Sequence, residues 1–270
     1  MVSQRILCLA MALSLSGPSQ VLWASTAWAA ETPAPAIAPE CAANATLDTR
    51  VEAVLAKTDR PEKQRANDAL RLSETRFVLD HIQPGDHVLD MGAGGGYASY
   101  LLSAAVCTGS VDSQNPPKWV EAFKMEPARQ ALTAARPNVH LVTSDFAKLP
   151  APAAPYDAIF IGTIYHDTYN EDGHDAVAMD KALLAALKPG GLVILTDHKT
   201  VDGAGAAATN TLHRIDKAQV LSDFKAAGFE LVEDSDVLAN PADDHSKNVF
   251  DPAIRGHTDR MALVFRRPLK

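Results

Sequence analysis

Short runs of apolar residues alternate with longer segments of helical periodicity along most of the chain. A continuous run such as DAIFIG (157–162) is typical of a strand that is buried on both faces of a sheet. In LDTRVEAVLAKT the apolar residues recur three or four positions apart, which is typical of a helix. The pattern predicts strands at 87–91, 109–114, 139–144, 157–162, 192–197, 229–235 and 260–266, with helices at 97–105, 117–135, 176–187 and 217–227.

This alternation predicts a parallel sheet with helices on both faces. Because crossovers between parallel strands are right-handed, the sheet should be doubly wound. A long polar loop (238–259), and no clear helix, joins the last two strands, and its DDHS segment (243–246) is expected at the surface. We therefore predict an α/β, doubly wound, Rossmann-like fold: a mostly parallel seven-stranded sheet in which the last edge strand is antiparallel.

The predicted Rossmann-like domain spans residues 87–270, and a leader, a linker and a helical cap precede it. Residues 46–86 have helical periodicity and should form an N-terminal helical cap. Its residues Arg65, Asp68 and Arg71 are candidates for a lid over a site, the alternative being an ordinary solvated helix face. Residues 30–45 include a stretch rich in Pro and Ala, which predicts a linker.

The first 29 residues have the features of a signal peptide. Arg5 precedes an apolar region (6–16), and Ala27-Trp28-Ala29 is a small-x-small cleavage site. We expect cleavage after Ala29 and export, to the periplasm of a bacterium. The alternative is an uncleaved membrane anchor, although Gly17 to Gln20 interrupt the apolar span, and contact with a membrane is expected only in that case.

Removal of the leader would leave two cysteines, Cys41 and Cys107. In an oxidising compartment such a pair can form a disulfide. The alternative is two unpaired residues that behave as small apolar side chains. The sequence does not decide between the two.

The charge of the chain argues against a nucleic-acid partner. Among its 270 residues, Asp and Glu number 33 and Lys and Arg number 25, and the basic residues form no block. Binding to a nucleic acid requires a basic face that neutralises phosphates. A small molecule is the expected substrate, and the oligomeric state is left open.

The most informative segment is VLDMGAGGGY (88–97), which follows the first predicted strand. In a doubly wound sheet, ligands bind beyond the carboxyl ends of the strands. Glycines at 92, 94 and 96 allow positive φ and close approach of a ligand to the backbone, and the turn leads into a helix N-terminus. Tyr97 stands where the third glycine of a G-x-G-x-x-G dinucleotide motif should be, so this motif is not matched.

Together with SDFAKLP (144–150), YDAIFIG (156–162) and LKPGGLVILTD (187–197), this segment resembles the class I S-adenosylmethionine-dependent methyltransferases. The resemblance covers about residues 77–266. QNPP (114–117), YHD (165–167) and the terminal FRRP are similar to a subgroup of exported bacterial methyltransferases of undefined substrate.

The resemblance implies S-adenosylmethionine as the cofactor and a role for each wall of its site. Asp90 and the three glycines Gly92, Gly94 and Gly96 would hold the methionine part, with Tyr97 beside them. Asp145 would accept a hydrogen bond from the adenine amino group, and Phe146 would lie beside the ring. Asn115, after Gln114, stands where the family has an acid for the ribose hydroxyls; a neutral amide offers a weaker bond, which predicts looser cofactor binding. The alternative is that Asn115 is a plain turn residue before Pro116.

The segment IYHDTYN follows the fourth predicted strand and supplies the candidate catalytic residues. His166 is the candidate base, Asp167 would orient it or bind a substrate cation, and Tyr165 would line the substrate pocket. The alternative is that His166 and Asp167 only bond loop backbone. A divalent metal can be imagined from Asp167, Asp172, His174, Asp175 and His198. No tight metal-binding spacing is present, so we predict no metal.

The predicted function is therefore S-adenosylmethionine-dependent methyl transfer to an oxygen or nitrogen of a small molecule. The alternative is a protein that binds or senses an adenosyl ligand without turnover, since fold alone does not fix function.

Overall fold

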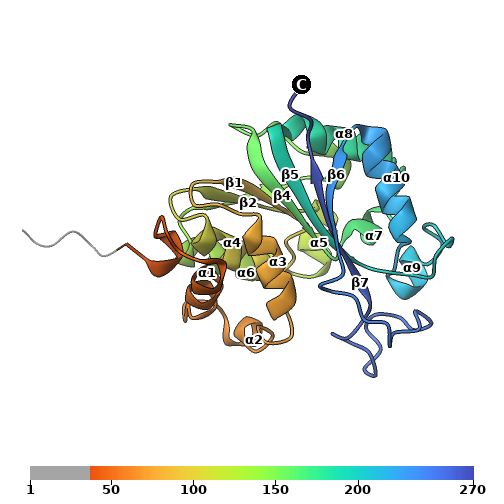
Figure 1. Ribbon diagram of the computed structural model, residues 1–270, viewed down its shortest axis with the longest axis horizontal. Coiled ribbons are helices and arrows are strands. Elements are labelled where there is room, and N and C mark those ends of the chain that lie inside the picture. Colours follow the sequence, from red (N-terminus) through yellow and green to blue (C-terminus); the bar gives the residue numbers. More distant parts are fainter. Residues whose placement is uncertain (1–36) are drawn as a thin grey trace, which may run out of the picture. The chain divides into compact units, whose positions relative to one another are not determined.

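The computed structural model describes residues 37–270, which form one compact unit. A seven-stranded sheet lies at its centre, in the order β3-β2-β1-β4-β5-β7-β6 (Figure 1). Its strands are β1 (His87–Met91), β2 (Ser110–Asn115), β3 (Val139–Thr143), β4 (Tyr156–Gly162), β5 (Leu187–His198), β6 (Glu230–Ser235) and β7 (Arg260–Arg266). Strands β1 to β5 pair in parallel, whereas β7 runs antiparallel to both β5 and β6.

The predicted fold is confirmed, with one refinement at the end of the sheet. The antiparallel strand expected there is β7, which lies between β5 and β6, so that β6 is outermost. Because β7 runs antiparallel beside β6, no crossover helix is needed between the two strands. The long polar loop connects them instead.

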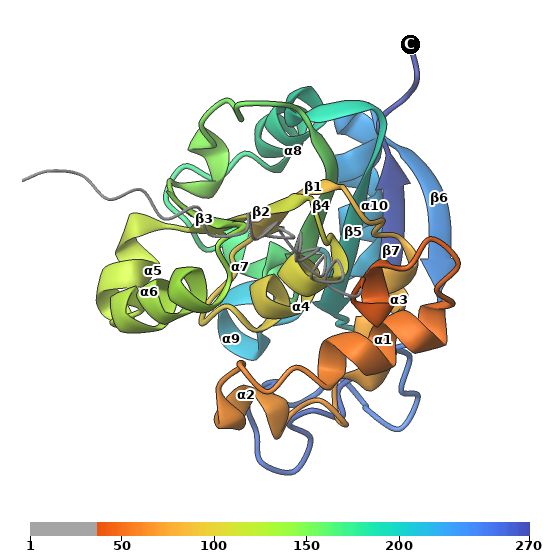
Figure 2. The same cartoon turned by 90° about the vertical axis from the view of Figure 1, so that its left-hand side faces the viewer.

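Helices cover both faces of the sheet, as the continuous apolar strands require. Figure 2 shows the strands between α8 on one side and α4 on the other. One core lies under α1, α3, α4 and α6, and a second lies under α7, α8 and α10. The helices are α1 (Leu47–Leu55), α2 (Glu62–Arg65), α3 (Leu72–Asp80), α4 (Tyr97–Ala105), α5 (Pro117–Ala122), α6 (Glu126–Ala135), α7 (Tyr165–Thr168), α8 (Ala176–Ala186), α9 (Thr209–Leu212) and α10 (Lys217–Ala227), with short 3-10 turns η1 (Pro39–Cys41) and η2 (Phe146–Lys148).

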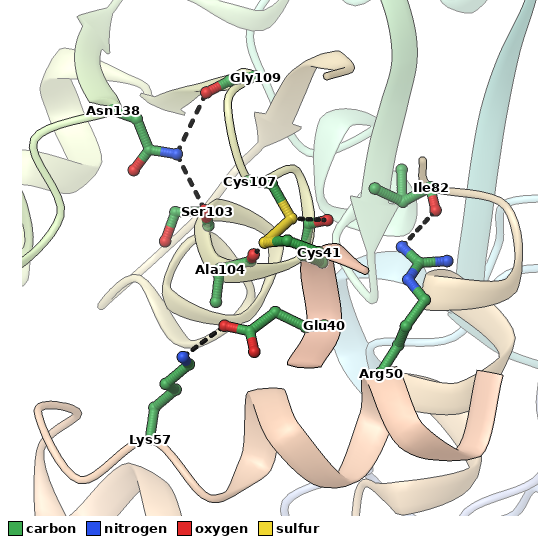
Figure 3. The surroundings of a disulfide bond; sticks show 11 residues. Glu40, Cys41, Arg50, Lys57, Ile82, Ser103, Ala104, Cys107, Gly109 and Asn138 are labelled. Atoms are coloured by element: carbon green, nitrogen blue, oxygen red, sulfur yellow. Dashed lines mark hydrogen bonds and ion pairs between the residues drawn. A yellow bond between two sulfur atoms is a disulfide. The ribbon is translucent and has the colours of Figure 1, made fainter. Parts of the chain in front are cut away.

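A disulfide between Cys41 and Cys107 fixes the N-terminal segment to the loop after α4 (Figure 3). Next to it, Glu40 is buried and forms an ion pair with Lys57 of the turn after α1. The residues from Pro39 onward are therefore packed against the domain and do not behave as the linker that the Pro- and Ala-rich composition predicted. The leader (1–29) and the linker as far as residue 36 lie outside the described residues.

The helical cap packs as part of the same unit. Thr46 caps α1 through its side chain, which accepts a hydrogen bond from the backbone of Thr49. Arg50 is buried and donates to the carbonyl oxygens of Leu79 and Ile82, which joins α1 to the end of α3. Within the described residues, no helix has the length and apolar character needed to cross a membrane.

The surface prediction for the DDHS segment holds for Asp244 and Ser246, which are exposed, but is wrong for Asp243. Asp243 of the DDHS segment is buried and forms a paired hydrogen-bonded ion pair with Arg214, which is also fully buried. The polar loop 238–259 is thus attached to the segment before α10 by an internal charge pair. A polar sequence alone does not reveal a buried partner that lies elsewhere in the chain.

Candidate active site

The strand order changes direction between β1 and β4, and folds of this type bind ligands beyond the carboxyl ends of the strands at that position. The glycine-rich loop lies there. Gly92 and Gly94 have φ values of 67° and 57°, a conformation that favours glycine. A Cβ at position 94 or 95 would meet no atom within 4 Å, whereas one at position 92 would lie 2.8 Å from the Ile164 side chain. The loop backbone is therefore open on the side where a ligand would approach.

Two side-chain amides at the end of β2 bind this loop. Gln114 Oε1 accepts from the backbone nitrogen of Gly92 at 2.9 Å, and Asn115 Oδ1 accepts from that of Gly94 at 2.8 Å. Asn115 also donates to the Gly94 carbonyl, and both amide residues are fully buried. Asn115 therefore does more than fill a turn: it fixes the loop. With its amide engaged in this way, its predicted contact with the ribose hydroxyls stays a prediction.

Asp90 lies near the end of β1, directly before the loop, and is buried. Ser99 of α4 donates to Asp90 Oδ2 at 2.5 Å, and the Ser99 and Ser113 hydroxyl oxygens are 2.9 Å apart. Burial raises the pKa of Asp90 to about 6, an effect that the Ser99 hydrogen bond and the charge of Arg71 only partly offset. This carboxylate is therefore ionised at neutral pH but takes up a proton in mildly acidic solution.

We predict that cofactor affinity falls as the pH is lowered through 6. Asp90 can attract the ammonium group of the methionine part only when its carboxylate is ionised, and its pKa is about 6. The dissociation constant should rise by up to about tenfold for each pH unit below 6. Isothermal calorimetry between pH 5 and 8 measures this. Asp145→Asn is the matched control, which should weaken binding but keep the pH dependence; a wild-type affinity independent of pH would contradict the assignment.

The predicted adenine side of the site has a cavity of its own. Asp145 and Phe146 follow β3 and lie on the wall of a cavity of about 330 Å³. Phe146 is buried and packs edge-on against Trp119, with 5.2 Å between the ring centroids. Asp145 is more exposed and its carboxylate is 3.3 Å from the Lys148 ammonium. The two residues are thus together, as the sequence predicted, while their contacts with adenine remain a prediction.

The helical cap covers the other side of the glycine loop. Gln64 of α2 donates to the carbonyl oxygen of Gly95 at 2.8 Å, and the Tyr97 hydroxyl donates to Asp68 Oδ1 at 3.0 Å. The Arg71 guanidinium stacks over the Tyr97 ring, 4.2 Å from its centroid. Two of the three residues considered for a lid, Asp68 and Arg71, therefore contact the residue that follows the glycines.

Arg71 is held by a buried carboxylate that the sequence did not single out. Glu74 of α3 is only 3% exposed and binds two arginines: Arg71 at 2.7 Å and Arg260 of β7 at 3.1 Å. Thr196 of β5 donates to it at 2.8 Å. Burial alone would raise the pKa of Glu74, but the two guanidinium charges and the Thr196 hydrogen bond bring it below its ordinary value. Glu74 thus joins the cap to the centre of the sheet.

Beside this carboxylate lies a small cationic cavity of about 170 Å³. It opens between the cap, the ends of β4 and β5, and the polar loop before β7. Burial lowers the pKa of His198, one of its walls, to about 4. The cavity is lined by Leu70, Arg71, Thr163, His198, Arg255, Gly256, Thr258 and Arg260.

His166 is clamped between two carboxylates. Its Nδ1 is 2.7 Å from Asp197 Oδ1, and its backbone nitrogen donates to Asp197 Oδ2 at 2.8 Å. Its Nε2 faces Asp167 Oδ1 at 3.3 Å. Burial alone would lower the pKa of His166, but the charges of Asp197 and Asp167 raise it to about 10. This environment favours a protonated ring, and the general-base role that the sequence suggested stays a prediction.

Asp167 and Tyr165, the other predicted catalytic residues, have different surroundings. Asp167 is partly exposed and also faces His213 Nδ1 at 3.2 Å, a histidine that sequence reasoning missed. Tyr165 is fully buried in the second core, where its hydroxyl donates to Asp180 at 2.8 Å and lies 3.2 Å from Asp223. A side chain with 0% exposure in that core cannot line a substrate pocket, so this assignment of Tyr165 is corrected.

Comparison with known proteins identifies the family of the chain. Residues 70–219, more than half of the chain, match the model of the protein-L-isoaspartate(D-aspartate) O-methyltransferase family. The chain belongs to this family. A curated relative, the protein-L-isoaspartate O-methyltransferase of Pyrococcus horikoshii, is 31% identical over 114 residues, which are 42% of this chain and 45% of the relative. The chain thus spans about half the length of such relatives.

More distant similarities extend over more of the chain. The uncharacterized methyltransferase YdaC of Bacillus subtilis is 28% identical over 155 residues, covering 56% of this chain and 76% of YdaC. A putative sarcosine dimethylglycine methyltransferase from Galdieria sulphuraria shares the fold, with a TM-score of 0.52 and 19% identity over 76% of this chain and 86% of that one. The family match and the shared fold together support a class I S-adenosylmethionine-dependent methyltransferase fold for this chain.

The residues of the site fit this cofactor. The open backbone at positions 94 and 95 leaves room for a ligand that approaches the loop closely. The buried Asp90 supplies a negative charge for an ammonium group, and the cavity beside Asp145 and Phe146 has an acceptor and an aromatic ring for a base. S-adenosylmethionine supplies the methyl group as a sulfonium, and the protein has to hold the acceptor in line with it.

Proposed function

We propose that the protein transfers the methyl group of S-adenosylmethionine to a carboxylate oxygen of a small acid. The observation that carries the proposal is the cationic cavity of about 170 Å³, whose wall includes Arg71, Arg255 and Arg260. A guanidinium group matches the two oxygens of a carboxylate in geometry as well as charge. Because Arg71 also stacks on Tyr97 after the glycine loop, an acid held here lies next to the cofactor site.

A carboxylate acceptor also suits the absence of a positioned base among the residues described for this site. Carboxylic acids are ionised at neutral pH, so no proton has to be removed before attack. One carboxylate oxygen forms a bond to the methyl carbon, the methyl–sulfur bond breaks, and the product is a methyl ester. His166 is not placed for that role, because Asp197 binds its Nδ1 and its Nε2 is buried beside Asp167. The arginines of the cavity would contribute orientation and charge, which are the main sources of rate acceleration in such a displacement.

A relative in the same family supports methyl transfer to a carboxylate oxygen. The Pyrococcus relative is a protein-L-isoaspartate O-methyltransferase, and an L-isoaspartate residue carries a carboxylate. The cavity here is small, which favours a small acid over a folded polypeptide. The alternative acceptor is a carboxylate carried by a peptide, and a transfer assay can distinguish the two.

The test is a transfer assay with labelled S-adenosylmethionine and three sets of acceptors: small mono- and dicarboxylic acids, acidic peptides, and amines or phenols. We expect label in a product that mild base releases as methanol, the behaviour of a methyl ester. Label that enters only amines or phenols would contradict the proposal. Label that enters only the peptides would move the substrate class toward that of the named relatives.

We predict that Arg255→Gln raises the KM for the acid by about tenfold and leaves cofactor affinity unchanged. Loss of one guanidinium from an acceptor site removes a charge-assisted hydrogen bond of roughly 1.5 kcal/mol. The matched control is Arg266→Gln, because Arg266 lies at the far end of β7, where it pairs with Glu230 at the surface. Steady-state kinetics measures the KM for the acid, and calorimetry measures the cofactor affinity. An equal rise of this KM in both variants would show that Arg255 does not bind the acid.

A non-catalytic protein that binds an adenosyl ligand is the second candidate. The observation in its favour is that Gln114 and Asn115 engage the backbone of Gly92 and Gly94 themselves. Mass spectrometry of the purified protein separates the two: a bound adenosyl ligand with no transfer to any acceptor set would favour the binding protein. No adenosyl ligand and no thermal shift with S-adenosylmethionine would count against both.

A further inference from the structure

Three side chains with metal-binding atoms meet at the carboxyl end of the sheet. His166 and Asp167 belong to α7, which follows β4, and His213 follows α9. One nitrogen of each histidine and one oxygen of Asp167 all lie within 4.8 Å of one another. We propose that His166, Asp167 and His213 bind a divalent transition-metal ion.

The spacing of the donor atoms suits one ion. Asp167 Oδ1 is 3.3 Å from His166 Nε2 and 3.2 Å from His213 Nδ1. Ligands bound tetrahedrally at about 2.0–2.1 Å from Zn²⁺ lie roughly 3.3 Å from one another. The two imidazole rings are nearly perpendicular, at 89°, with 5.5 Å between their centroids. The donor atoms of two rings and one carboxylate thus lie within reach of a single ion.

The Nε2 atom of His166 provides independent evidence for a ligand. The His166 side chain is 3% exposed, yet Nε2 has no hydrogen-bond partner of acceptable geometry, although Asp167 Oδ1 is 3.3 Å away. A buried polar atom without a partner is costly and calls for an explanation. A metal ion on Nε2 would supply the missing partner.

The surroundings hold the first histidine in the orientation that a metal requires. Asp197 binds Nδ1 of His166 at 2.7 Å, on the side of the ring away from Asp167. Metal-binding histidines commonly make this contact, because a carboxylate on one ring nitrogen orients the other toward the ion. Asp197 also accepts from the backbone nitrogen of His166, so the histidine is fixed at two points.

The second histidine is held by its own backbone and a neighbouring ring. His213 has a φ of 55°, the left-handed conformation that ends α9, and its ring packs edge-on against Phe250 with 5.0 Å between centroids. His166 and His213 are therefore placed before an ion arrives.

The donor set indicates the class of ion. Two imidazoles with one carboxylate suit zinc or another first-row divalent ion, whereas Mg²⁺ and Ca²⁺ prefer oxygen ligands. Asp167 and His213 are 25% and 29% exposed, so the remaining coordination positions of the ion face solvent. The His198 ring, which lines the cationic cavity, has its centroid 6.0 Å from that of His166. An ion here would be a further positive charge beside that cavity, and it would join α7 to the segment after α9.

Co²⁺ tests the site because its visible absorption reports nitrogen and oxygen ligands. The untagged protein is dialysed against a chelator, then against metal-free buffer, and titrated with Co²⁺ followed by Zn²⁺. We expect one equivalent of Co²⁺ to give a visible band that one equivalent of Zn²⁺ abolishes. Absence of a saturable band in the wild-type protein, together with no heat from Zn²⁺ in calorimetry, would overturn the proposal.

Two variants locate the ion. His213→Asn removes one imidazole but keeps a residue that tolerates the left-handed conformation, and Asp167→Asn removes the shared carboxylate. Each should weaken Zn²⁺ binding at least tenfold. His140→Ala is the matched control, because His140 also lies beside an aspartate, Asp112, but is exposed on the edge strand β3. Binding that survives in both variants, or that is lost equally in the control, would show that the metal lies elsewhere.

Discussion

Replacing Glu74 with Gln should lower the free energy of unfolding by about 3 kcal/mol and the kcat/KM for methyl transfer by more than tenfold. The substitution keeps the shape of the side chain but removes the charge that holds Arg71 and Arg260. Breaking a buried ion pair from one side leaves the other charge without compensation, which typically costs 3–5 kcal/mol. Urea unfolding measures the first effect and steady-state kinetics the second.

The loss of activity follows from the position of the two arginines. Both line the proposed acceptor cavity, and Arg71 also stacks on Tyr97 beside the glycine loop. Without Glu74 their guanidinium groups are free to turn toward solvent. A purely structural role for Glu74 would lower stability without changing the KM for the acid, and that result would contradict the proposed acceptor site.

The control and the pH dependence sharpen this test. Glu230→Gln breaks an ion pair with Arg266 at the other end of β7, where both side chains are about half exposed, and should cost less than about 1 kcal/mol. The pKa of Glu74 is lowered on folding, so its contribution to stability is present above the pKa of an unfolded glutamate and is lost as the pH falls below it. The difference between wild type and Glu74→Gln should therefore shrink in acid.

Local patterns explain why the elements could be predicted so closely. The strands HVLDM and RMALVFR and the helix 217–227 have the bounds expected from the sequence. Their signals are local: continuous apolar runs for the strands, and for the helix a recurrence of apolar residues that Gly228 stops in the left-handed conformation. The predicted cofactor residues lie on or directly after β1, β2 and β3, so the parallel order of the strands brings them together.

The misassignment of Tyr165 shows the limit of prediction from neighbouring residues. Tyr165, His166 and Asp167 follow one another, but α7 is a helical turn that sends neighbouring side chains in different directions. Positions three apart share a face, so Tyr165 and Thr168 both enter the core, at 0% and 1% exposure. His166 instead meets Asp197 and Asp167 meets His213. Adjacency in the sequence does not reveal this separation.

The residues that sequence reasoning missed come from distant parts of the chain. Arg255 of the polar loop and Arg260 of β7 line one cavity, while Glu74 of the cap holds Arg260 in place, and no motif connects the three residues. His213 lies 46 positions from its partner Asp167. Such groups become visible only once the sheet order is known, because the strands of the sheet determine which loops meet at its carboxyl edge.

Removing the disulfide should cost about 4 kcal/mol of unfolding free energy. Cys41 and Cys107 are 66 positions apart, and closing a loop of this length lowers the entropy of the unfolded chain by an amount equivalent to about 4 kcal/mol. The bond joins the segment before α1 to the loop after α4, whose helix begins at the glycine loop (Figure 3). The double variant Cys41→Ser/Cys107→Ser, compared with the wild type in urea, measures the loss.

Reduction of the wild-type protein provides the matching comparison and bears on where the protein works. A reductant should lower wild-type stability to that of the double variant and leave the variant itself unchanged. Disulfides persist in oxidising compartments and are rare in the cytosol, so a bond of this value supports the proposed export to the periplasm. Equal stability of the oxidised and reduced forms would remove that support. A large difference would mean that α4 and the glycine loop before it are fully stabilised only after the protein reaches an oxidising environment. Cofactor affinity should then be higher in the oxidised form than in the reduced one.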